Sequence, residues 1–168
     1  MTIAEFDHLD TAQKRTLLLQ CCGSAVWADK IIAILPAEDL IDLLEIAEDT
    51  WYACGKQDWL EAFAQHPKIG DLQSLKEKFN STAQLAEDEQ SSVKQASEQI
   101  LKELAEGNQQ YEEKFGYIFI ISASGKSAND MLGSLKERMK NSPEEELKIA
   151  MEEQLKIAKL RIEKLFTT

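Results

Sequence analysis

The chain has 168 residues, 43% of them hydrophobic and 29% charged, which suits one soluble globular domain. Its formal net charge of -11 argues against nucleic acid or a membrane surface as partner, because both favour basic proteins. No apolar run approaches the roughly 20 residues needed to cross a bilayer, and the N-terminus does not resemble a signal peptide. Three cysteines without metal-ligand spacing suggest reduced thiols, so we expect a cytoplasmic protein.

Helical signals dominate the first part of the chain. Residues that favour N-cap positions precede the first three expected helices: Thr2, Asp10 and Ser24. A fourth helix is expected over 37–53 with Gly55 as its C-cap, and Asp58 should begin a short helix that ends at His66.

The second part of the chain is also predicted to be helical. Its expected helices, in chain order, are 72–79, 84–105, 110–115, 128–140 and 143–166. Gly107 should end the second of these helices, and Pro143 is well placed to begin the last. The pattern predicts a single all-α domain over 1–168, with about eight to nine helices and at most one short extended segment near 117–122.

His66 is the first candidate for chemistry. It lies in the segment Gln-His-Pro-Lys-Ile-Gly-Asp, between an apolar helix and a Pro/Gly turn. The residue before a proline is disfavoured in the helical region, so His66 should project from a helix end. Histidine also has the one side chain whose ordinary pKa suits proton transfer near neutral pH. A structural histidine in a turn is the competing interpretation.

Polar residues interrupt the apolar faces of two predicted helices. In the long middle helix, Glu89 and Gln90 fall close to the stripe formed by Ala86, Val93, Ile100 and Leu104. In the last helix, Arg161 lies inside the apolar sector, with Gln154 two turns before it. A buried charge needs a partner or a ligand. Glu89 and Arg161 therefore either form a buried structural ion pair, reach water at the rim, or serve a functional site.

Two other patterns do not support a site. Ser124-Gly125-Lys126-Ser127 resembles the end of a phosphate-binding loop, but that motif needs glycine where this chain has Ile120, so a polar turn and helix cap is expected. The two histidines lack the spacing of a zinc site, and no metal is expected.

Several motifs occur in an order that resembles one known family. They are His66-Pro67-Lys68-Ile69-Gly70, Glu89-Gln90, Tyr111-x-x-Lys114-Phe115-Gly116-x-x-Phe119-Ile120, Arg138-x-x-Asn141 and Lys156-Ile157-Ala158-x-x-Arg161. Together they resemble OHCU decarboxylase, the last enzyme of the route from urate to allantoin. The resemblance covers nearly the whole chain. It implies an all-α homodimer that decarboxylates 2-oxo-4-hydroxy-4-carboxy-5-ureidoimidazoline (OHCU) to (S)-allantoin without a metal or an organic cofactor.

The resemblance also implies roles for individual residues. His66 would be the proton donor, and Glu89 and Arg161 would complete the catalytic group. The implied substrate-binding residues are Pro67, Ala86, Glu87, Asp88, Gln90, Phe119, Ile120, Ile121, Ser122 and Ala123. The family often has serine where this chain has Ala86, so a hydroxyl contact would be missing or supplied by Thr82 or Ser92. The alternatives are a non-catalytic helical interaction domain, or a decarboxylase or lyase for another small ureido acid.

Overall fold

The computed structural model describes residues 1–66 and 90–167, with side chains at 90–97 left out. Every regular element in these residues is an α-helix, and no strand occurs among them, which confirms the predicted all-α class. The residues divide into two units by their contacts: unit 1 is 1–66 with 149–168, and unit 2 is 67–148. The prediction of one domain over 1–168 stays a prediction.

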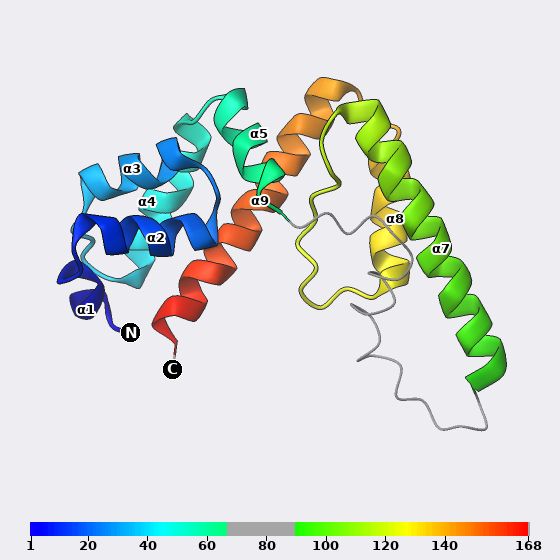
Figure 1. The fold of residues 1–168 in the computed structure, drawn as a ribbon, viewed down its shortest axis with the longest axis horizontal. Coiled ribbons are helices and arrows are strands. Elements are labelled where there is room, and N and C mark those ends of the chain that lie inside the picture. The colour runs from blue at the N-terminus through cyan, green and yellow to red at the C-terminus, as the bar shows by residue number, and fades with distance from the viewer. Residues whose placement is uncertain (67–89, 168) are drawn as a thin grey trace. The chain divides into compact units, whose positions relative to one another are not determined.

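Unit 1 contains five helices from the start of the chain and most of the last helix (Figure 1). The helices are α1 (Ile3–Asp7), α2 (Thr11–Cys21), α3 (Ala25–Ile34), α4 (Leu40–Ala53), α5 (Lys56–Ala64) and the part of α9 (Pro143–Phe166) from residue 149. The predicted caps of the first three are confirmed, because the side chains of Thr2, Asp10 and Ser24 each accept a backbone N–H of the first turn.

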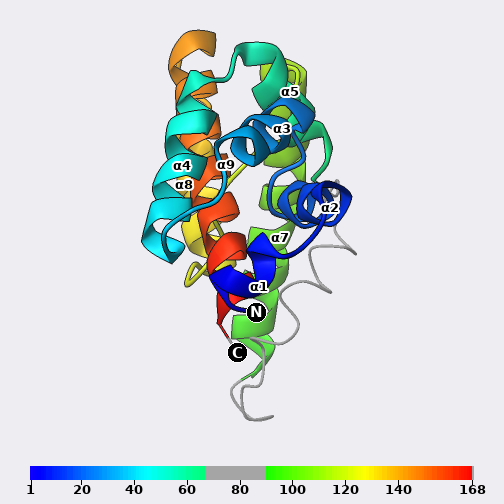
Figure 2. The ribbon, with the colours of Figure 1, turned by 90° about the vertical axis from the view of Figure 1, so that its left-hand side faces the viewer.

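Two tryptophans tie α4 into the core of unit 1. The indole Nε1–H of Trp27 on α3 donates to the Ala47 carbonyl at 3.0 Å, and that of Trp51 donates to the Met151 carbonyl of α9 at 2.8 Å. Both tryptophans are fully buried. Figure 2 shows α9 running beside α4, as these contacts require. Burying two such side chains with their N–H groups satisfied stabilises the unit by several kcal/mol, at about 1.5–3 kcal/mol for each large apolar side chain.

The boundaries around α5 differ from the prediction. The fourth helix begins at Leu40, not 37, because Asp39 is its N-cap and accepts the Asp42 N–H at 2.8 Å. Gly55 is not a C-cap but the N-cap of α5, and Asp58 is the third residue of that helix, where its carboxylate accepts the Gly55 N–H at 3.0 Å. The predicted roles of both residues are therefore wrong: Gly55 begins α5 instead of ending α4, and Asp58 lies inside α5 instead of capping it.

Unit 2 contains α7 (Gln90–Phe115), α8 (Ala128–Arg138) and the start of α9. The predicted end at Gly107 is wrong, because α7 continues through it and includes the short helix expected at 110–115. A β-carbon on Gly107 would come within 2.5 Å of the Leu135 side chain, so this glycine lets α8 pack closely against α7. The prediction for 72–79 lies outside the described residues.

The stretch between α7 and α8 is neither helix nor strand. Ser127 ends it as the N-cap of α8, in a capping box with Asp130, so the turn and cap expected at 124–127 are confirmed. Its aromatic residues pack onto α7, with the Phe119 and Tyr111 ring centroids 5.2 Å apart. None of the described helices is long and apolar enough to cross a membrane.

Candidate active site

His66 lies just beyond the end of α5, as the Pro67 pattern predicts. The helix ends at Ala64, Gln65 is its C-cap, and the His66 backbone N–H donates to the Phe63 carbonyl at 3.3 Å. The imidazole is half-buried, and its Nε2 lies 2.5 Å from Oε1 of Gln154 on α9. The histidine ring is therefore held by a side chain 88 positions away in the sequence.

The surroundings of His66 favour the neutral imidazole. Burial lowers the pKa of this group below its usual 6.5, the hydrogen bond to Gln154 raises it, and the positive charge of Arg161 lowers it. The net direction is down, so His66 is mostly uncharged at neutral pH. Among the described residues, Arg161 is the charged group that acts on this pKa.

Arg161 lies near enough to His66 for its charge to act on that residue, but its side chain is exposed. The alternative of a buried Glu89–Arg161 ion pair is therefore wrong as far as the burial of Arg161 is concerned. Its Nη1 donates to the Gln20 and Cys21 carbonyls, each at 3.4 Å. These carbonyls close the C-terminal end of α2, where a positive charge is favoured by the helix dipole. Among the described residues, these hydrogen bonds use one nitrogen of the guanidinium, and the Arg161 side chain is otherwise exposed.

Gln154 is the residue of this group that sequence analysis noted but did not assign to the site. Its side chain is 1% exposed, and among the described residues its Nε2 amine has no hydrogen-bond partner. Among the described residues, its side chain makes one hydrogen bond, the one to His66. Gln154 lies about two turns before Arg161 on α9. Gln154 contacts His66 beyond the end of α5, whereas Arg161 contacts the end of α2 and acts on His66 through its charge.

Several expected site residues lie outside the described residues: Pro67, Thr82, Ala86, Glu87, Asp88 and Glu89. Gln90 is described only as the first residue of α7, and the side chain of Ser92 is not described. The structure therefore brings together His66 and Arg161 from the predicted catalytic group, and the position of Glu89 stays a prediction.

The predicted substrate-binding stretch from Phe119 to Ala123 lies in unit 2 and is not helical. Three of its carbonyls are bound. The Ile120 carbonyl accepts Arg138 Nη1 at 2.7 Å, the Ser122 carbonyl accepts Lys126 Nζ at 2.9 Å, and the Ala123 carbonyl accepts the Lys126 N–H at 3.1 Å. These bonds fix the backbone of the stretch. The Phe119 ring also lies 4.5 Å from the Arg138 guanidinium carbon, in a cation–π arrangement.

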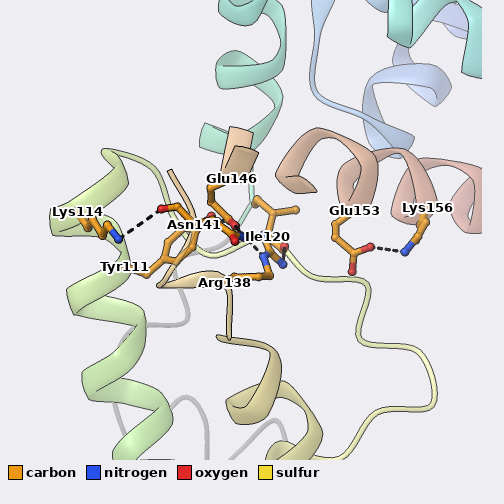
Figure 3. Close-up of polar contacts among 8 residues, drawn as sticks. All are labelled: Tyr111, Lys114, Ile120, Arg138, Asn141, Glu146, Glu153 and Lys156. Carbon is orange, nitrogen blue, oxygen red and sulfur yellow. Dashed lines mark hydrogen bonds and ion pairs between the residues drawn. The ribbon is translucent and has the colours of Figure 1, made fainter. Parts of the chain in front are cut away.

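A buried ionic cluster, which sequence analysis missed, holds that stretch (Figure 3). Arg138 Nε and Glu146 Oε1 are 2.6 Å apart, and their side chains are 9% and 0% exposed. The Tyr111 hydroxyl donates to the same carboxylate at 2.5 Å, and Asn141 Nδ2 donates to its other oxygen at 3.0 Å. Burial and the bond to Glu146 both raise the pKa of Tyr111, so it stays a donor. We refer to Tyr111, Arg138, Asn141 and Glu146 as the Arg138 cluster.

The sequence contained a signal for this cluster. Three glutamates at 144–146 follow Pro143 in the first turn of α9, and Glu144 and Glu145 are exposed. Glu146, however, lies four residues before buried Ala150 and eight before buried Gln154, so it shares their face of α9. A phase count begun at Pro143 would have predicted its burial and the need for a cationic partner.

Comparisons with known proteins agree on one family. The family model for OHCU decarboxylase matches residues 7–163, which include parts of both units. The uric acid degradation bifunctional protein TTL of Arabidopsis thaliana is 40% identical over 148 residues, which are 88% of this chain and 45% of that protein. The bifunctional protein PucL of Bacillus subtilis strain 168 is 23% identical over 99% of this chain and 33% of its own length. The chain thus spans less than half of these curated relatives.

Solved structures show the same fold. The crystal structure of OHCU decarboxylase in the presence of (S)-allantoin is 38% identical and matches with a TM-score of 0.70, covering 89% of this chain and 96% of that one. The crystal structure of (S)-allantoin synthase matches with a TM-score of 0.72 over 98% of this chain and 54% of that one. At 19% identity this second match concerns the fold alone.

Proposed function

Because the chain belongs to the OHCU decarboxylase family, we propose that it decarboxylates 2-oxo-4-hydroxy-4-carboxy-5-ureidoimidazoline to (S)-allantoin during urate breakdown. The observation that carries this proposal is the family match over residues 7–163, and the half-buried His66 lies within it. The bifunctional relatives are longer, so the proposal concerns this one reaction.

The substrate itself can accept the electrons that decarboxylation releases. One ring carbon carries the carboxylate and a hydroxyl, and the next carbon carries the ureido group and a ring C=N. When CO₂ leaves, the bonding pair forms a carbon–carbon double bond, and the C=N pair moves to the ring nitrogen, which takes a proton from water. No organic cofactor is needed to hold these electrons, so the chain's own residues supply orientation and proton transfer.

His66 would complete the reaction by moving one proton. The intermediate is an enol whose hydroxyl proton must leave, while the ureido-bearing carbon must gain a proton. A neutral imidazole can take the hydroxyl proton and then act as the proton donor to that neighbouring carbon. Delivery to one face of the ring would set the S configuration. A positioned group of this kind contributes roughly 10²–10⁴-fold in rate.

Arg161 would bind an anionic or carbonyl oxygen of the substrate. Its Nη1 is anchored on α2, which leaves the outer part of the guanidinium for a ligand. An arginine counters the net charge of -11, which otherwise disfavours an anionic substrate. Glu89 would orient the hydroxyl or ureido group. The backbone N–H groups between Phe119 and Ala123 would bind the ring carbonyl, and Pro67 with the 86–90 turn would line the ring.

We also propose a cytoplasmic homodimer. The three cysteines are free thiols, which supports a reducing compartment. The homodimer rests on the family resemblance. Sedimentation of the purified chain would measure its mass in solution.

The test uses the unstable substrate made in place from urate. The appearance of (S)-allantoin is followed by circular dichroism with and without the chain. We expect the chain to accelerate formation of the S product and His66→Asn to remove the acceleration. His8→Asn is the matched control, since His8 is exposed in unit 1 and its imidazole contacts only the Ala4 carbonyl by a hydrogen bond among the described residues. Equal traces with and without the chain would favour a non-catalytic interaction domain.

A further inference from the structure

The contact between His66 and Gln154 restricts which imidazole nitrogen can exchange a proton with a ligand. His66 Nε2 and Gln154 Oε1 are 2.5 Å apart, close enough that one proton must lie between them. An amide oxygen has no proton to give, so the proton belongs to Nε2. In the neutral imidazole the lone pair is then on Nδ1.

We propose that Gln154 is a positioning residue that fixes His66 in its Nε2–H form and leaves Nδ1 as the nitrogen that exchanges the substrate's proton. The exchange of a proton with substrate rests on the proposed function. The assignment of the Nε2–H tautomer does not depend on that function. Gln154 does not touch reacting atoms in this proposal. It acts through the orientation and protonation state of the ring.

Burial makes Gln154 suited to this role. The side chain is 1% exposed, so water does not compete for its oxygen. A ring rotated away from Gln154 would leave a buried acceptor unsatisfied, which disfavours that rotation. In this orientation the buried Nε2 amine of Gln154 has no hydrogen-bond partner among the described residues. If the amide turned over, that nitrogen would meet Nε2 and demand the opposite tautomer.

The uncharged amide also matters for the proton cycle. A carboxylate at position 154 would still accept from Nε2–H but would stabilise the imidazolium. Glutamine accepts the same hydrogen bond without that charge, while burial and Arg161 lower the pKa of His66. The ring can therefore take a proton at Nδ1 and release it again near neutral pH.

The direct test is NMR of the imidazole nitrogens, because a protonated and an unprotonated ring nitrogen have distinct ¹⁵N shifts. The chain has two histidines, and His8→Gln assigns their signals. At a pH above its pKa, wild-type His66 should show Nε2–H in roughly tenfold excess or more. A predominant Nδ1–H form, or an even mixture, would overturn the proposal.

Two substitutions separate positioning from packing. Gln154→Met keeps the length of the side chain and removes the acceptor, so the tautomer excess should fall and kcat should drop roughly 10–100-fold with KM little changed. Gln154→Glu restores the acceptor, so the Nε2–H form should return and the pKa of His66 should rise. Circular dichroism and unfolding curves check that both variants are folded. An unchanged tautomer ratio in Gln154→Met would refute the role of Gln154.

The proposed function and the positioning role of Gln154 can be refuted separately. If the wild-type chain does not form allantoin but the tautomer depends on Gln154, the proposed function is lost and the positioning role stands. If the chain is active and Gln154→Met alters neither the tautomer nor the pH dependence of kcat, the positioning role is lost and the proposed function stands.

Discussion

Gly23 and Gln65 approach each other so closely that a β-carbon on Gly23 would lie 2.4 Å from Gln65 Cγ and 2.6 Å from its Cβ. Gly23 lies in the turn between α2 and α3, and Gln65 is the C-cap of α5, directly before His66. The atoms in question are near the backbone, so a side-chain rotation cannot relieve the contact. The absence of a side chain at Gly23 therefore sets where the end of α5 lies.

We expect Gly23→Ala to move His66 as well as reduce stability. Overpacking of this kind costs about 1–3 kcal/mol, and a shift of the ring by about 1 Å lowers kcat up to 10²-fold. Urea unfolding and allantoin formation measure the two effects. Gly133→Ala on α8 is the matched control, because nothing lies within 4 Å of the added β-carbon. It should be neutral or slightly stabilising in a helix. Full activity in Gly23→Ala would show that α5 can adjust.

In the Arg138 cluster, we expect one single substitution to lower the unfolding free energy more than the double substitution does. Arg138→Met leaves the fully buried Glu146 carboxylate without its ionic partner, which should cost about 3–5 kcal/mol of unfolding free energy. Adding Glu146→Gln removes the stranded charge and keeps an acceptor for Tyr111, so the double variant should regain much of that loss. Urea unfolding of the wild type, both single variants and the double variant gives the coupling energy.

A surface pair in the same unit provides the control. Lys140 and Glu137 are 3.2 Å apart with side chains 71% and 75% exposed, so Lys140→Met should change the unfolding free energy by less than about 1 kcal/mol. If Arg138→Met costs no more than Lys140→Met, the buried cluster does not stabilise unit 2. Additive losses in the double variant would likewise contradict a stranded charge.

Whether the sequence predicts a feature of this fold depends on whether that feature is caused by neighbouring residues. N-caps at Thr2, Asp10 and Ser24 were predicted correctly, because a cap depends on a few neighbouring residues. Gly107 was misjudged because its role is a close approach to Leu135, which no local pattern reveals. His66 and Arg161 were found as polar residues at unusual positions. The partner of His66 could not be assigned, since Gln154 reaches it only through the packing of α9 in unit 1.

The lowered pKa of His66 predicts how stability changes with pH. Because burial makes the folded pKa lower than the unfolded value near 6.5, protonation favours the unfolded chain. The contribution of His66 is therefore full above pH 6.5 and is lost as pH falls through the folded pKa. Relative to His66→Asn, the wild type should lose at most about 1.4 kcal/mol per pH unit in that window.

Unfolding curves at several pH values, taken for both chains, measure this difference and cancel the shared carboxylates. Arg161→Met should make the loss smaller, because the arginine charge helps to lower the pKa of His66. A wild type that gains stability over His66→Asn on acidification would contradict the lowered pKa.

The three thiols should resist alkylation in the folded chain. Cys21, Cys22 and Cys54 are 2%, 1% and 6% exposed, and burial raises the pKa of Cys21 to about 11 and that of Cys22 to about 12. At pH 8 a thiol with a pKa of about 11 is thiolate in only about one molecule in a thousand. Labelling with iodoacetamide, followed by intact mass, should be slow in buffer and reach three adducts in urea. Rapid labelling of Cys22 in buffer would mean that the turn between α2 and α3 opens, and the contact of Gly23 with Gln65 that positions His66 would then be transient.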